Sequence, residues 1–363
     1  MKNSFGQNVT ITVFGESHGA GVGAVLDGMP AGIPVDEAFI KHQLSLRRPS
    51  GDISTPRVEA DNYIIYSGVL GGFTTGTPIC VVVPNENTNS KDYTDDRFIS
   101  RPSHADFVAF KKYNGFEDYR GGGHFSGRVT AGVVAVGAVA ISALKQKGIK
   151  IGTHISRCAG VDDAAFANYE TEIDALNNMS FAVLDSAKGE QMKEKILSAK
   201  AECDSVGGVL ETAVIGLPVG VGEPWFDTLE GMLSHALFSI PAVKGVEFGL
   251  GFGIADLMGS QANDELEVKN GEIITKTNNN GGINGGISNG MPVVLRCAVK
   301  PTPTIAKPQS TVNFSTNENT VLQSLGRHDP CIVHRARVVV DSMVAITLCD
   351  ALTAKFGTDW WQK

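Results

Sequence analysis

Two long apolar stretches, residues 129–144 and 338–352, constrain the fold of this 363-residue chain more than any other feature. Neither stretch has a polar face, which is the mark of a helix that is covered on all sides. The first stretch is shorter than the roughly 20 residues that a membrane span needs, and small and polar residues interrupt it. We therefore expect two buried helices inside a large hydrophobic core.

The order of segments around these stretches repeats. Residues 71–78 and 285–292 both read G-G-x-x-x-G-x-P, and an apolar strand pattern follows each of them. Upstream, residues 28–32 and 216–220 form a second matched pair of Gly/Pro turns, each followed by a helical pattern. The same succession of strand, turn, helix, hairpin and buried helix in both halves predicts an internal duplication. The helical patterns cover residues 35–46 and 226–238.

We expect a single domain over residues 1–363, with pseudo-repeat halves at about residues 1–150 and 205–355. The predicted strands alternate Val or Ile with polar residues and are joined by glycine turns, a pattern typical of antiparallel sheets with one face inward. The predicted fold class is therefore α+β, with buried apolar helices between antiparallel sheets and an internal pseudo-twofold duplication. A doubly wound nucleotide fold is disfavoured, because no G-x-G-x-x-G joins a strand to a helix and no P-loop motif occurs.

Charge is distributed unevenly along the chain. The net charge is −8, which argues against a nucleic-acid partner. Residues 161–275 carry 20 acidic and 6 basic side chains, whereas the arginines gather around glycine- and histidine-rich motifs outside this segment. We expect an acidic connection between the two halves at about residues 161–204. A solvated acidic face is the alternative interpretation of that segment.

The cysteine pattern argues against two kinds of site. Six cysteines are scattered without a C-x-x-C pair, and no H-E-x-x-H motif occurs. We therefore expect neither a disulfide framework nor a metal site. The first residues of the sequence lack an apolar secretory region, so we expect a cytoplasmic protein that does not span a membrane.

A histidine at the end of the first predicted strand is the first candidate catalytic group. His18 lies in the motif F-G-E-S-H-G, between the apolar run 9–14 and a glycine-spaced stretch. Because glycines leave the backbone bare, a ligand can approach such a histidine closely. Imidazole is also the side chain most readily poised to exchange a proton near neutral pH.

The central motif, residues 101–128, combines arginines, histidines and three successive glycines. Backbone N–H groups of consecutive glycines can line a concave surface against an anion, and arginines can grip carboxylate or phosphate oxygens. Residues 124–126 are expected to begin the first buried helix, whose N-terminal amides also favour negative charge. A glycine-rich turn with surface arginines is the alternative interpretation.

A third motif, residues 326–337, contains Asp329, which precedes a proline and is therefore held in an extended conformation. A carboxylate beside an arginine usually stays ionised. An N-terminal helix cap with a salt bridge is the alternative role for Asp329. Further basic or glycine-rich groups are Arg48, Arg57, the stiff turn 300–304 and the loop 278–286. Together these segments predict a site for a small, multiply anionic substrate, with two histidines and one aspartate as proton carriers.

The chain resembles the chorismate synthase family essentially from end to end. The segments that carry the resemblance are GESHG at residue 15, RRP at 47, SGVLGGFTTGTPI at 67, RPSHAD at 101, DYRGGG at 118, AVKGVE at 242, GGINGGISNG at 281, KPTPT at 300 and GRHDPC at 326. So many motifs in the same order over more than 300 residues make the resemblance specific.

The resemblance implies an anti 1,4-elimination of phosphate from 5-enolpyruvylshikimate 3-phosphate to give chorismate, the last common step of the shikimate pathway. It implies a requirement for reduced FMN without net redox change, with NADPH only as an indirect source of flavin reduction. It also implies a β-α-β sandwich fold and a homotetramer. The substrate carries a phosphate and two carboxylates, which suits the arginine-rich motifs.

The resemblance also implies roles by motif position. His18 is expected to act as the acid near the departing phosphate, His104 to protonate or hydrogen-bond the reduced flavin, and Asp329 to assist deprotonation at the flavin. The expected substrate anchors are Arg48, Arg57, Arg101, Arg120 and Arg128. The expected FMN contacts are His124, Phe125, Ser126, Pro241, Ala242, Gly285, Lys300, Pro301, Thr302, Pro303, Thr304 and Arg327.

Some positions depart from the commoner family pattern. They are Ser103 where Gly is usual, Asn114 as an apparent insertion, HFSG at residues 124–127 in place of RSSA, Pro241 in place of Asn, and His334 where Pro is frequent. None of them replaces an expected catalytic residue, so we expect a family variant with retained activity. Two other functions stay open: a flavin reductase or other redox enzyme, for which the chain shows no nicotinamide fingerprint, and a non-catalytic binding module for anionic metabolites.

Overall fold

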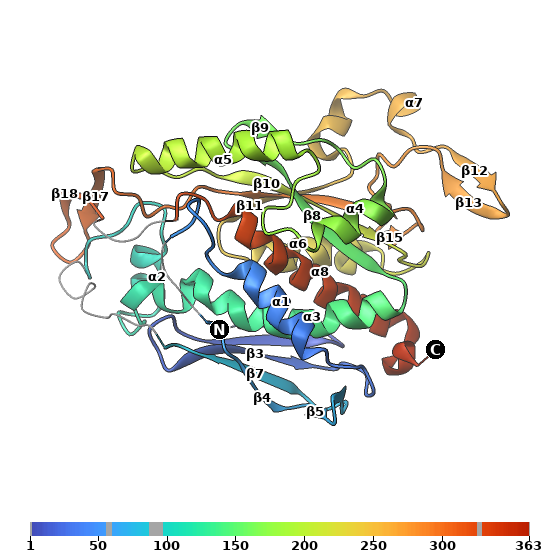
Figure 1. Cartoon of the computed structure of the whole chain (residues 1–363), viewed down its shortest axis with the longest axis horizontal. Helices are drawn as coiled ribbons and strands as arrows, with labels where there is room; N and C mark the ends of the chain where they lie inside the picture. The colour runs from blue at the N-terminus through green and yellow to red at the C-terminus, as the bar shows by residue number, and fades with distance from the viewer. Residues whose placement is uncertain (1, 56–59, 87–96, 325–328, 363) are drawn as a thin grey trace.

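Two antiparallel sheets enclose a layer of helices in the computed structural model of the chain (Figure 1). The structure describes residues 2–55, 60–86, 97–324 and 329–362. In spatial order, the first sheet contains β1 (Ser4–Phe5), β2 (Thr10–Gly15), β3 (Gly21–Asp27), β7 (Ile79–Pro84) and β4 (Ile64–Ser67). The second contains β11 (Val243–Phe248), β16 (Val293–Val299), β10 (Gly208–Ile215), β8 (Lys150–Cys158) and β9 (Val161–Asp162). The helices between the sheets are α1 (Glu37–Arg47), α3 (Thr130–Gln146), α6 (Leu229–Phe238) and α8 (Val333–Phe356). The predicted α+β class, with helices between antiparallel sheets, is confirmed.

Short hairpins and outer helices complete the fold. The hairpins are β5 (Val69–Leu70) with β6 (Phe73–Thr74), β12 (Leu266–Lys269) with β13 (Glu272–Thr275), β14 (Ile283–Asn284) with β15 (Ile287–Ser288), and β17 (Gln309–Asn313) with β18 (Glu318–Leu322). The outer helices are α2 (Asp106–Lys112), α4 (Tyr169–Leu176), α5 (Ser186–Ala201) and α7 (Gly259–Ala262). Short 3-10 turns cover Arg120–Phe125, Gly127–Val129, Trp225–Asp227, Gly251–Asp256 and Thr358–Trp361.

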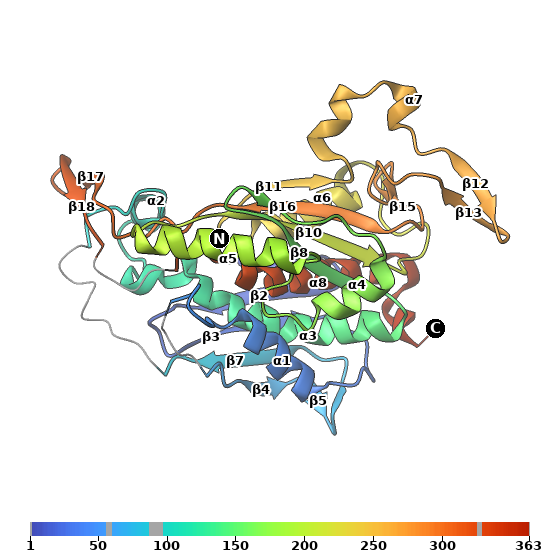
Figure 2. The same ribbon diagram turned by 45° about the horizontal axis from the view of Figure 1, so that its top comes forward.

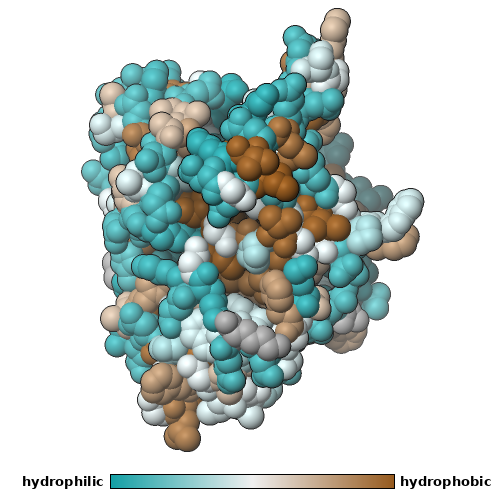
Figure 3. Space-filling view, turned by 90° about the vertical axis from the view of Figure 1, so that its right-hand side faces the viewer, coloured by the Kyte–Doolittle hydropathy of each residue, from teal (hydrophilic) through white to brown (hydrophobic). Residues whose placement is uncertain are grey.

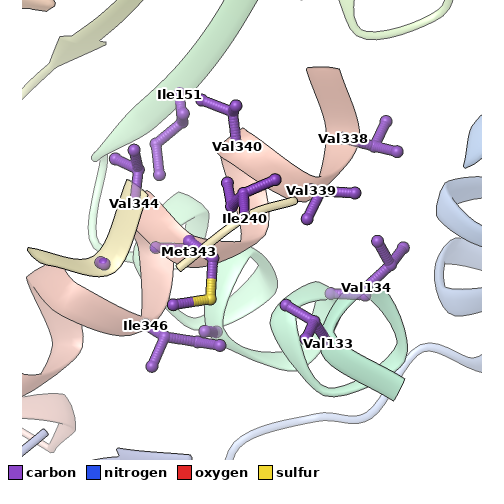
Figure 4. Close-up of a cluster of buried hydrophobic side chains, with 14 of the residues drawn as sticks. Val133, Val134, Ile151, Ile240, Val338, Val339, Val340, Met343, Val344 and Ile346 are labelled. Atoms are coloured by element: carbon purple, nitrogen blue, oxygen red, sulfur yellow. The ribbon is translucent and has the colours of Figure 1, made fainter. Parts of the chain in front are cut away.

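The two apolar stretches form the central helices, α3 and α8. Gly137 of α3 lies so close to α8 that a Cβ atom there would stand 2.3 Å from Cβ of Ser342. On its other side α3 touches the first sheet, where a Cβ atom at Gly132 would stand 2.4 Å from the carbonyl carbon of Gly23. Val340 and Val344 of α8 in turn lie next to Ile151 of β8 in the second sheet (Figure 4). Both helices are therefore covered on all sides, as predicted.

One stretch of the described chain, Gly127–Gln146, is long and apolar enough to cross a membrane when judged by length and composition alone. In the structure, 78% of its most apolar window is buried inside the molecule. The same stretch contains α3, whose neighbours are α8 and the first sheet. The burial agrees with the prediction of a core helix for this stretch.

The two sheets share one chain order. In the first sheet β2, β3, β7 and β4 are neighbours in that order, and in the second β8, β10, β16 and β11 repeat the scheme. Helix α1 follows β3 as α6 follows β10, and α3 follows β7 as α8 follows β16. The strand order of each half is therefore the same although the segments between the strands differ in length.

The matched Gly/Pro turns also make matched contacts. Gly28 and Gly216 both have positive φ, 84° and 79°, and a Cβ atom at either would meet a backbone oxygen at 1.9 Å or 2.1 Å. In each half a hairpin hydroxyl bridges the turn by donating to one carbonyl and accepting from one N–H. In the first half, Thr74 Oγ1 donates to Pro30 O and accepts from the N–H of Ile33. In the second half, Ser288 Oγ donates to Pro218 O and accepts from the N–H of Val221. Equivalent glycines therefore serve the same local geometry in both halves.

Exposed apolar side chains gather at the end of the molecule that carries the β12–β13 hairpin (Figure 3). In two views this hairpin projects from the body at the end opposite to α2 (Figures 1 and 2). On the hairpin, Leu266, Val268 and Ile273 are 70%, 75% and 69% exposed. Apolar patches of this kind are typical of surfaces that contact another protein.

The acidic segment, residues 161–204, runs between β8 and β10, which are neighbours in the second sheet. It is therefore an excursion from that sheet, whereas the sequence predicts a connection between the two halves. Within it, α4 packs on the outer face of the sheet, where Ile173 lies directly against Gly152 of β8.

A buried histidine fastens this excursion to the sheet. The side chain of His154 in β8 is fully buried, with Nδ1 2.8 Å from Asp163 Oδ2 and Nε2 3.2 Å from Glu211 Oε1. Asp163 also accepts hydrogen bonds from the backbone N–H groups of Leu184 and Asp185, at the start of α5. Burial by itself lowers the pKa of His154, but the two carboxylates outweigh it and raise the pKa above the usual 6.5.

We predict that this cluster makes the stability of the chain depend on pH. Because the folded-state pKa of His154 lies above the unfolded value, its stabilising contribution is fully present below about pH 6.5 and is lost as the pH rises through the folded-state pKa. In His154→Gln the free energy of unfolding should fall by about 3–5 kcal/mol at low pH, because buried carboxylates lose their partner. Urea denaturation across this pH range measures both effects. His42→Gln, whose ring contacts the backbone carbonyl of Asn177, is the matched control. An unaltered pH slope in His154→Gln would contradict the assignment.

Candidate active site

Three consecutive glycines lie at the centre of the candidate site. Gly121, Gly122 and Gly123 have φ values of 58°, 83° and 52°, a left-handed conformation that other residues rarely adopt. Ser17 fastens this loop, because its N–H donates to Gly123 O at 3.1 Å and its Oγ donates to Gly121 O at 3.0 Å. The predicted glycine loop and the motif around His18 are therefore in direct contact.

The loop brings the two predicted histidines together. A Cβ atom at Gly121 would stand 2.6 Å from Nε2 of His18, and one at Gly122 would stand 3.3 Å from Nε2 of His104. His18 follows β2 and is 9% exposed, whereas His104 precedes α2 in a distant part of the chain. Both imidazoles present their Nε2 edge to neighbouring peptide units, and only glycine fits beside them.

His104 belongs to a cluster within the motif at residues 101–106. Its Nδ1 lies 2.7 Å from Oδ1 of Asp106, which also accepts from Nη2 of Arg101 at 2.7 Å. The other carboxylate oxygen accepts from Arg101 Nε at 2.9 Å. Burial by itself raises the pKa of Asp106, but the hydrogen bonds from Arg101 and His104 hold it well below its usual value. The guanidinium of Arg101, an expected substrate anchor, is therefore engaged by Asp106.

A buried ion-pair network lies behind the glycine loop. Asp61 pairs with Arg47 at 3.0 Å and with Arg128, and all three side chains are buried. Arg128 also donates through Nε to Asn85 Oδ1 at 3.1 Å and through Nη2 to Pro84 O at 3.2 Å. Burial by itself raises the pKa of Asp61, but the two arginines hold it below its usual value. All three guanidinium nitrogens of Arg128 therefore bind protein groups.

Asn85 transmits this network to the first histidine. Its Nδ2 donates to the carbonyl oxygens of Glu16 at 2.9 Å and Gly19 at 3.0 Å, which flank His18 in the motif. The position of the His18 loop therefore depends on Arg128, in the 3-10 turn that precedes α3.

The other expected substrate anchors have different surroundings. Arg120 bonds to Asp118 through Nε at 2.8 Å and Nη2 at 2.7 Å, and these bonds hold the pKa of Asp118 below its usual value. The side chain of Arg120 is nevertheless 40% exposed. Arg48 donates to Ala60 O at 3.0 Å. Arg57 and the expected flavin contact Arg327 lie outside the described residues.

Asp329 is held by contacts on two sides. Its Oδ1 accepts from the N–H of Thr55 at 2.9 Å, and its Oδ2 pairs with Nη1 of Arg335 at 2.7 Å. Arg335 Nε also donates to the carbonyl of Arg47, at the end of α1. Helix α8 begins at Val333 without a side-chain cap, so the alternative role of Asp329 as a helix cap is wrong, whereas its salt bridge is confirmed.

The first group of expected flavin contacts lies between the glycine loop and α3. His124 Nδ1 is 2.8 Å from Gly15 O, and the ring of Phe125 is 38% exposed. Ser126 caps the 3-10 turn that follows it by accepting from the backbone N–H of Arg128. These residues precede the buried helix, which starts at Thr130, and do not form its first turn as the sequence predicts.

A second group reaches the turn that carries His104. Lys300 Nζ donates to the carbonyl of Ser103 at 2.6 Å, and its backbone N–H donates to Ala242 O at 3.0 Å. Pro241 and Ala242 therefore adjoin the start of the segment 300–304. Within that segment the buried Oγ1 of Thr302 has no hydrogen-bond partner among the described residues.

The expected contact at Gly285 lies elsewhere. Gly285 is in the turn between β14 and β15, and β15 lies at the end of the long axis opposite to α2 (Figures 1 and 2). His104 lies at the α2 end, because α2 begins two residues after it. Within a single chain, Gly285 is therefore far from the two histidines.

Some polar residues of this arrangement are not among the predicted site residues, notably Asp61, Asn85, Asp106 and Asp118. Asp106 and Asp118 each lie two residues from a predicted site residue, so an acid at i±2 from a His or Arg is the signal that identifies them. Asp61 and Asn85 come from separate loops, and no spacing in the sequence points to them.

Comparisons with known proteins identify the family. The family model for chorismate synthase matches residues 9–353. A chorismate synthase of Dehalococcoides mccartyi is 48% identical over 354 residues, with 96% of each chain covered. One of Thermococcus kodakarensis is 45% identical over 347 residues, again with 96% of each chain covered. The chain belongs to the chorismate synthase family.

The fold leads to the same family. A solved structure titled "Crystal Structure of Chorismate Synthase" is similar with a TM-score of 0.76 and 32% sequence identity, covering 97% of this chain and 94% of that chain. The family expected from the motifs is therefore confirmed. With it, the chain is an enzyme, a carbon–oxygen lyase that acts on a phosphate-bearing substrate.

We predict that Gly121→Ala lowers turnover by about 10²–10⁴, the range for loss of a positioned acid or base. The new methyl group would stand 2.6 Å from His18 Nε2 on a backbone with φ of 58°, so the ring or the loop must move. Turnover at saturating substrate measures the effect, with circular dichroism to confirm folding. Gly127→Ala, whose Cβ would meet nothing within 4 Å, is the matched control and should keep normal turnover. Equal turnover in the two variants would contradict the placement of His18 against the loop.

Proposed function

We propose that the chain catalyses the anti 1,4-elimination of phosphate from 5-enolpyruvylshikimate 3-phosphate to give chorismate, the last common step of the shikimate pathway. The observation that carries this proposal is the convergence of the Nε2 edges of His18 and His104 on one glycine loop. Two proton-exchanging groups so placed suit a reaction that removes a proton and releases an anion.

The roles of the individual residues are those that the family resemblance implies, adjusted to the surroundings of each residue. His18 protonates or hydrogen-bonds the departing phosphate, and Asp329 assists deprotonation. Arg120, with its exposed guanidinium, binds substrate oxygens together with Arg48 and Arg57. Arg101 and Arg128 act on the substrate indirectly. Arg101 holds Asp106, which bonds to His104, and Arg128 holds Asn85, which bonds to the backbone around His18. Preorganised cations of this kind stabilise the charge that develops on a leaving phosphate.

The residues around His104 fit a flavin. Gly122 leaves the backbone bare beside the imidazole, since a Cβ there would stand 3.2 Å from the ring. Phe125 offers an exposed aromatic surface, and the buried hydroxyl of Thr302 has no partner among the described residues. When bound there, reduced FMN would supply reducing equivalents that are returned, so that the elimination would have no net redox change. We propose that His104, His124–Ser126, Pro241–Ala242, Arg327 and residues 300–304 hold it, and that NADPH enters only as an indirect source of flavin reduction.

Three further proposals concern the molecule as a whole. The exposed apolar side chains of the β12–β13 hairpin support a homotetramer, because assembly would cover them. A biosynthetic role in the cytoplasm accords with the family. The shared strand order and the matched hydroxyl bridges support an internal duplication with a pseudo-twofold relation between the halves.

The test is an anaerobic assay with 5-enolpyruvylshikimate 3-phosphate and chemically reduced FMN, following phosphate and chorismate. Product should form with reduced and not with oxidised flavin. His18→Ala and His104→Ala should each lower turnover by about 10²–10⁴. His235→Ala, whose ring packs on Phe5, is the control and should keep activity.

Other outcomes would support other functions. Oxidation of NADPH by FMN with the chain alone would indicate a flavin reductase. Tight binding of both ligands without product would indicate a binding module. Near-normal turnover in either site-histidine variant would remove that histidine from the reaction.

We predict that replacing Arg120 changes KM and that replacing Arg128 changes the free energy of unfolding. Arg120→Ala should raise KM for the substrate about 10- to 100-fold, the effect of losing a charge-assisted hydrogen bond, while stability stays nearly constant. Arg128→Ala should instead lower the free energy of unfolding by about 3–5 kcal/mol, because the buried Asp61 loses a partner.

Steady-state kinetics and urea denaturation of both variants separate the two roles. Arg157→Ala is the control for both measurements, because Arg157 forms an exposed ion pair with Asp162 at the end of β8. A stable Arg128→Ala variant with a raised KM would show that Arg128 binds substrate directly.

A further inference from the structure

The hydrogen bond between His104 and Asp106 fixes which ring nitrogen carries hydrogen. Nδ1 lies 2.7 Å from Oδ1 of Asp106, and both side chains are 17% exposed. An ionised carboxylate can only accept a hydrogen bond, so the hydrogen lies on Nδ1. Nε2, which faces Gly122, is then the nitrogen with a free electron pair in the neutral ring.

Arg101 keeps the carboxylate of Asp106 ionised, as this hydrogen bond requires. The guanidinium donates to both carboxylate oxygens, from Nη2 to Oδ1 at 2.7 Å and from Nε to Oδ2 at 2.9 Å. The backbone N–H of Arg101 adds a bond to Oδ2 at 2.9 Å. Nη2 also lies 3.1 Å from His104 Nδ1. Since two donors cannot bond to each other, this proximity is a consequence of their shared acceptor.

A helix-start role does not account for Asp106. It is the first residue of α2, a position where carboxylates often bond to backbone N–H groups of the helix. The cap of α2 has no side-chain hydrogen bond, and the Asp106 oxygens accept from Arg101 and His104 instead. The turn itself is constrained, because Ser103 has φ of 61° and its carbonyl accepts from Lys300 Nζ.

We propose that Asp106, held by Arg101, is a positioning residue that keeps His104 in the Nδ1–H tautomer and presents Nε2 toward Gly122. His104 can then accept a proton at Nε2 and, once protonated, donate from it, while the carboxylate stabilises the imidazolium. The role in turnover rests on the proposed function, whereas the tautomer itself does not.

The tautomer can be measured without substrate or flavin on protein that carries ¹⁵N-labelled histidine. Two-bond ¹H–¹⁵N correlation spectra at about pH 9, well above the usual range for histidine, should show His104 with hydrogen on Nδ1. The spectrum of His104→Gln identifies its signals. In Asp106→Asn the amide oxygen should turn to Arg101, which can only donate, and the NH₂ group to Nδ1. The hydrogen of His104 should then move to Nε2.

Two results of this measurement would overturn the proposal. One is wild-type His104 with its hydrogen on Nε2. The other is a folded Asp106→Asn variant in which the hydrogen stays on Nδ1.

A comparison of kcat between two variants of Asp106 supplies an independent test. Asp106→Asn should lower kcat by about 10²–10⁴ with KM little changed, because it enforces the wrong tautomer. Asp106→Ala enforces neither tautomer, so its kcat should fall less than that of Asp106→Asn. A merely structural role gives the reverse order, since Asn matches the shape of Asp better than Ala does.

Asp185→Asn is the matched control for a carboxylate at a helix start. Asp185 accepts from the N–H groups of Ala187 and Lys188 in α5, and its replacement should leave kcat unchanged. Higher kcat in Asp106→Asn than in Asp106→Ala would overturn the positioning role. If the wild type forms no chorismate, the proposed function fails, and the spectra alone decide the role of Asp106.

Discussion

The close approach of α3 to both of its neighbours determines where the site lies. At Gly132 its backbone touches β3, and at Gly137 it touches α8, so the helix cannot shift along its axis without a clash. Its N-terminal end therefore has a fixed position, where Arg128 meets the buried carboxylate of Asp61. A buried ion pair tolerates little displacement, because unpaired charge is costly there. Through Asn85 the packing of one helix is transmitted to the backbone around His18.

Five of the described arginines near the site pair with carboxylates, and two of them share one carboxylate. The pairs are Arg47 and Arg128 with Asp61, Arg101 with Asp106, Arg120 with Asp118, and Arg335 with Asp329. The site is thus a set of oriented ion pairs in a chain with a net charge of −8. The N-terminal ends of α3 and α8 both point toward the α2 end (Figure 1), which adds positive potential without further cations.

The elements that could be predicted are those whose signal is local. The central helices follow from stretches without a polar face, and His18 and His104 follow from their motifs. The residues that hold the motifs in place depend on contacts between distant segments: Asp61 and Asn85 come from loops with no distinctive pattern. The alternative role of Asp329 as a helix cap failed for a similar reason, since Thr55 and Arg335 supply its partners and the helix begins only at Val333.

The difference between the two halves shows how one scaffold supports one site. In the first half a short turn that contains His18 joins β2 to β3. In the second half the equivalent strands, β8 and β10, are joined by the acidic excursion with α4 and α5, which covers the outer face of the sheet. His154 fastens that excursion to the sheet, whereas His18 lies in the short turn between β2 and β3. Because connections can change without disturbing paired strands, a repeated strand order is compatible with a different connection in each half.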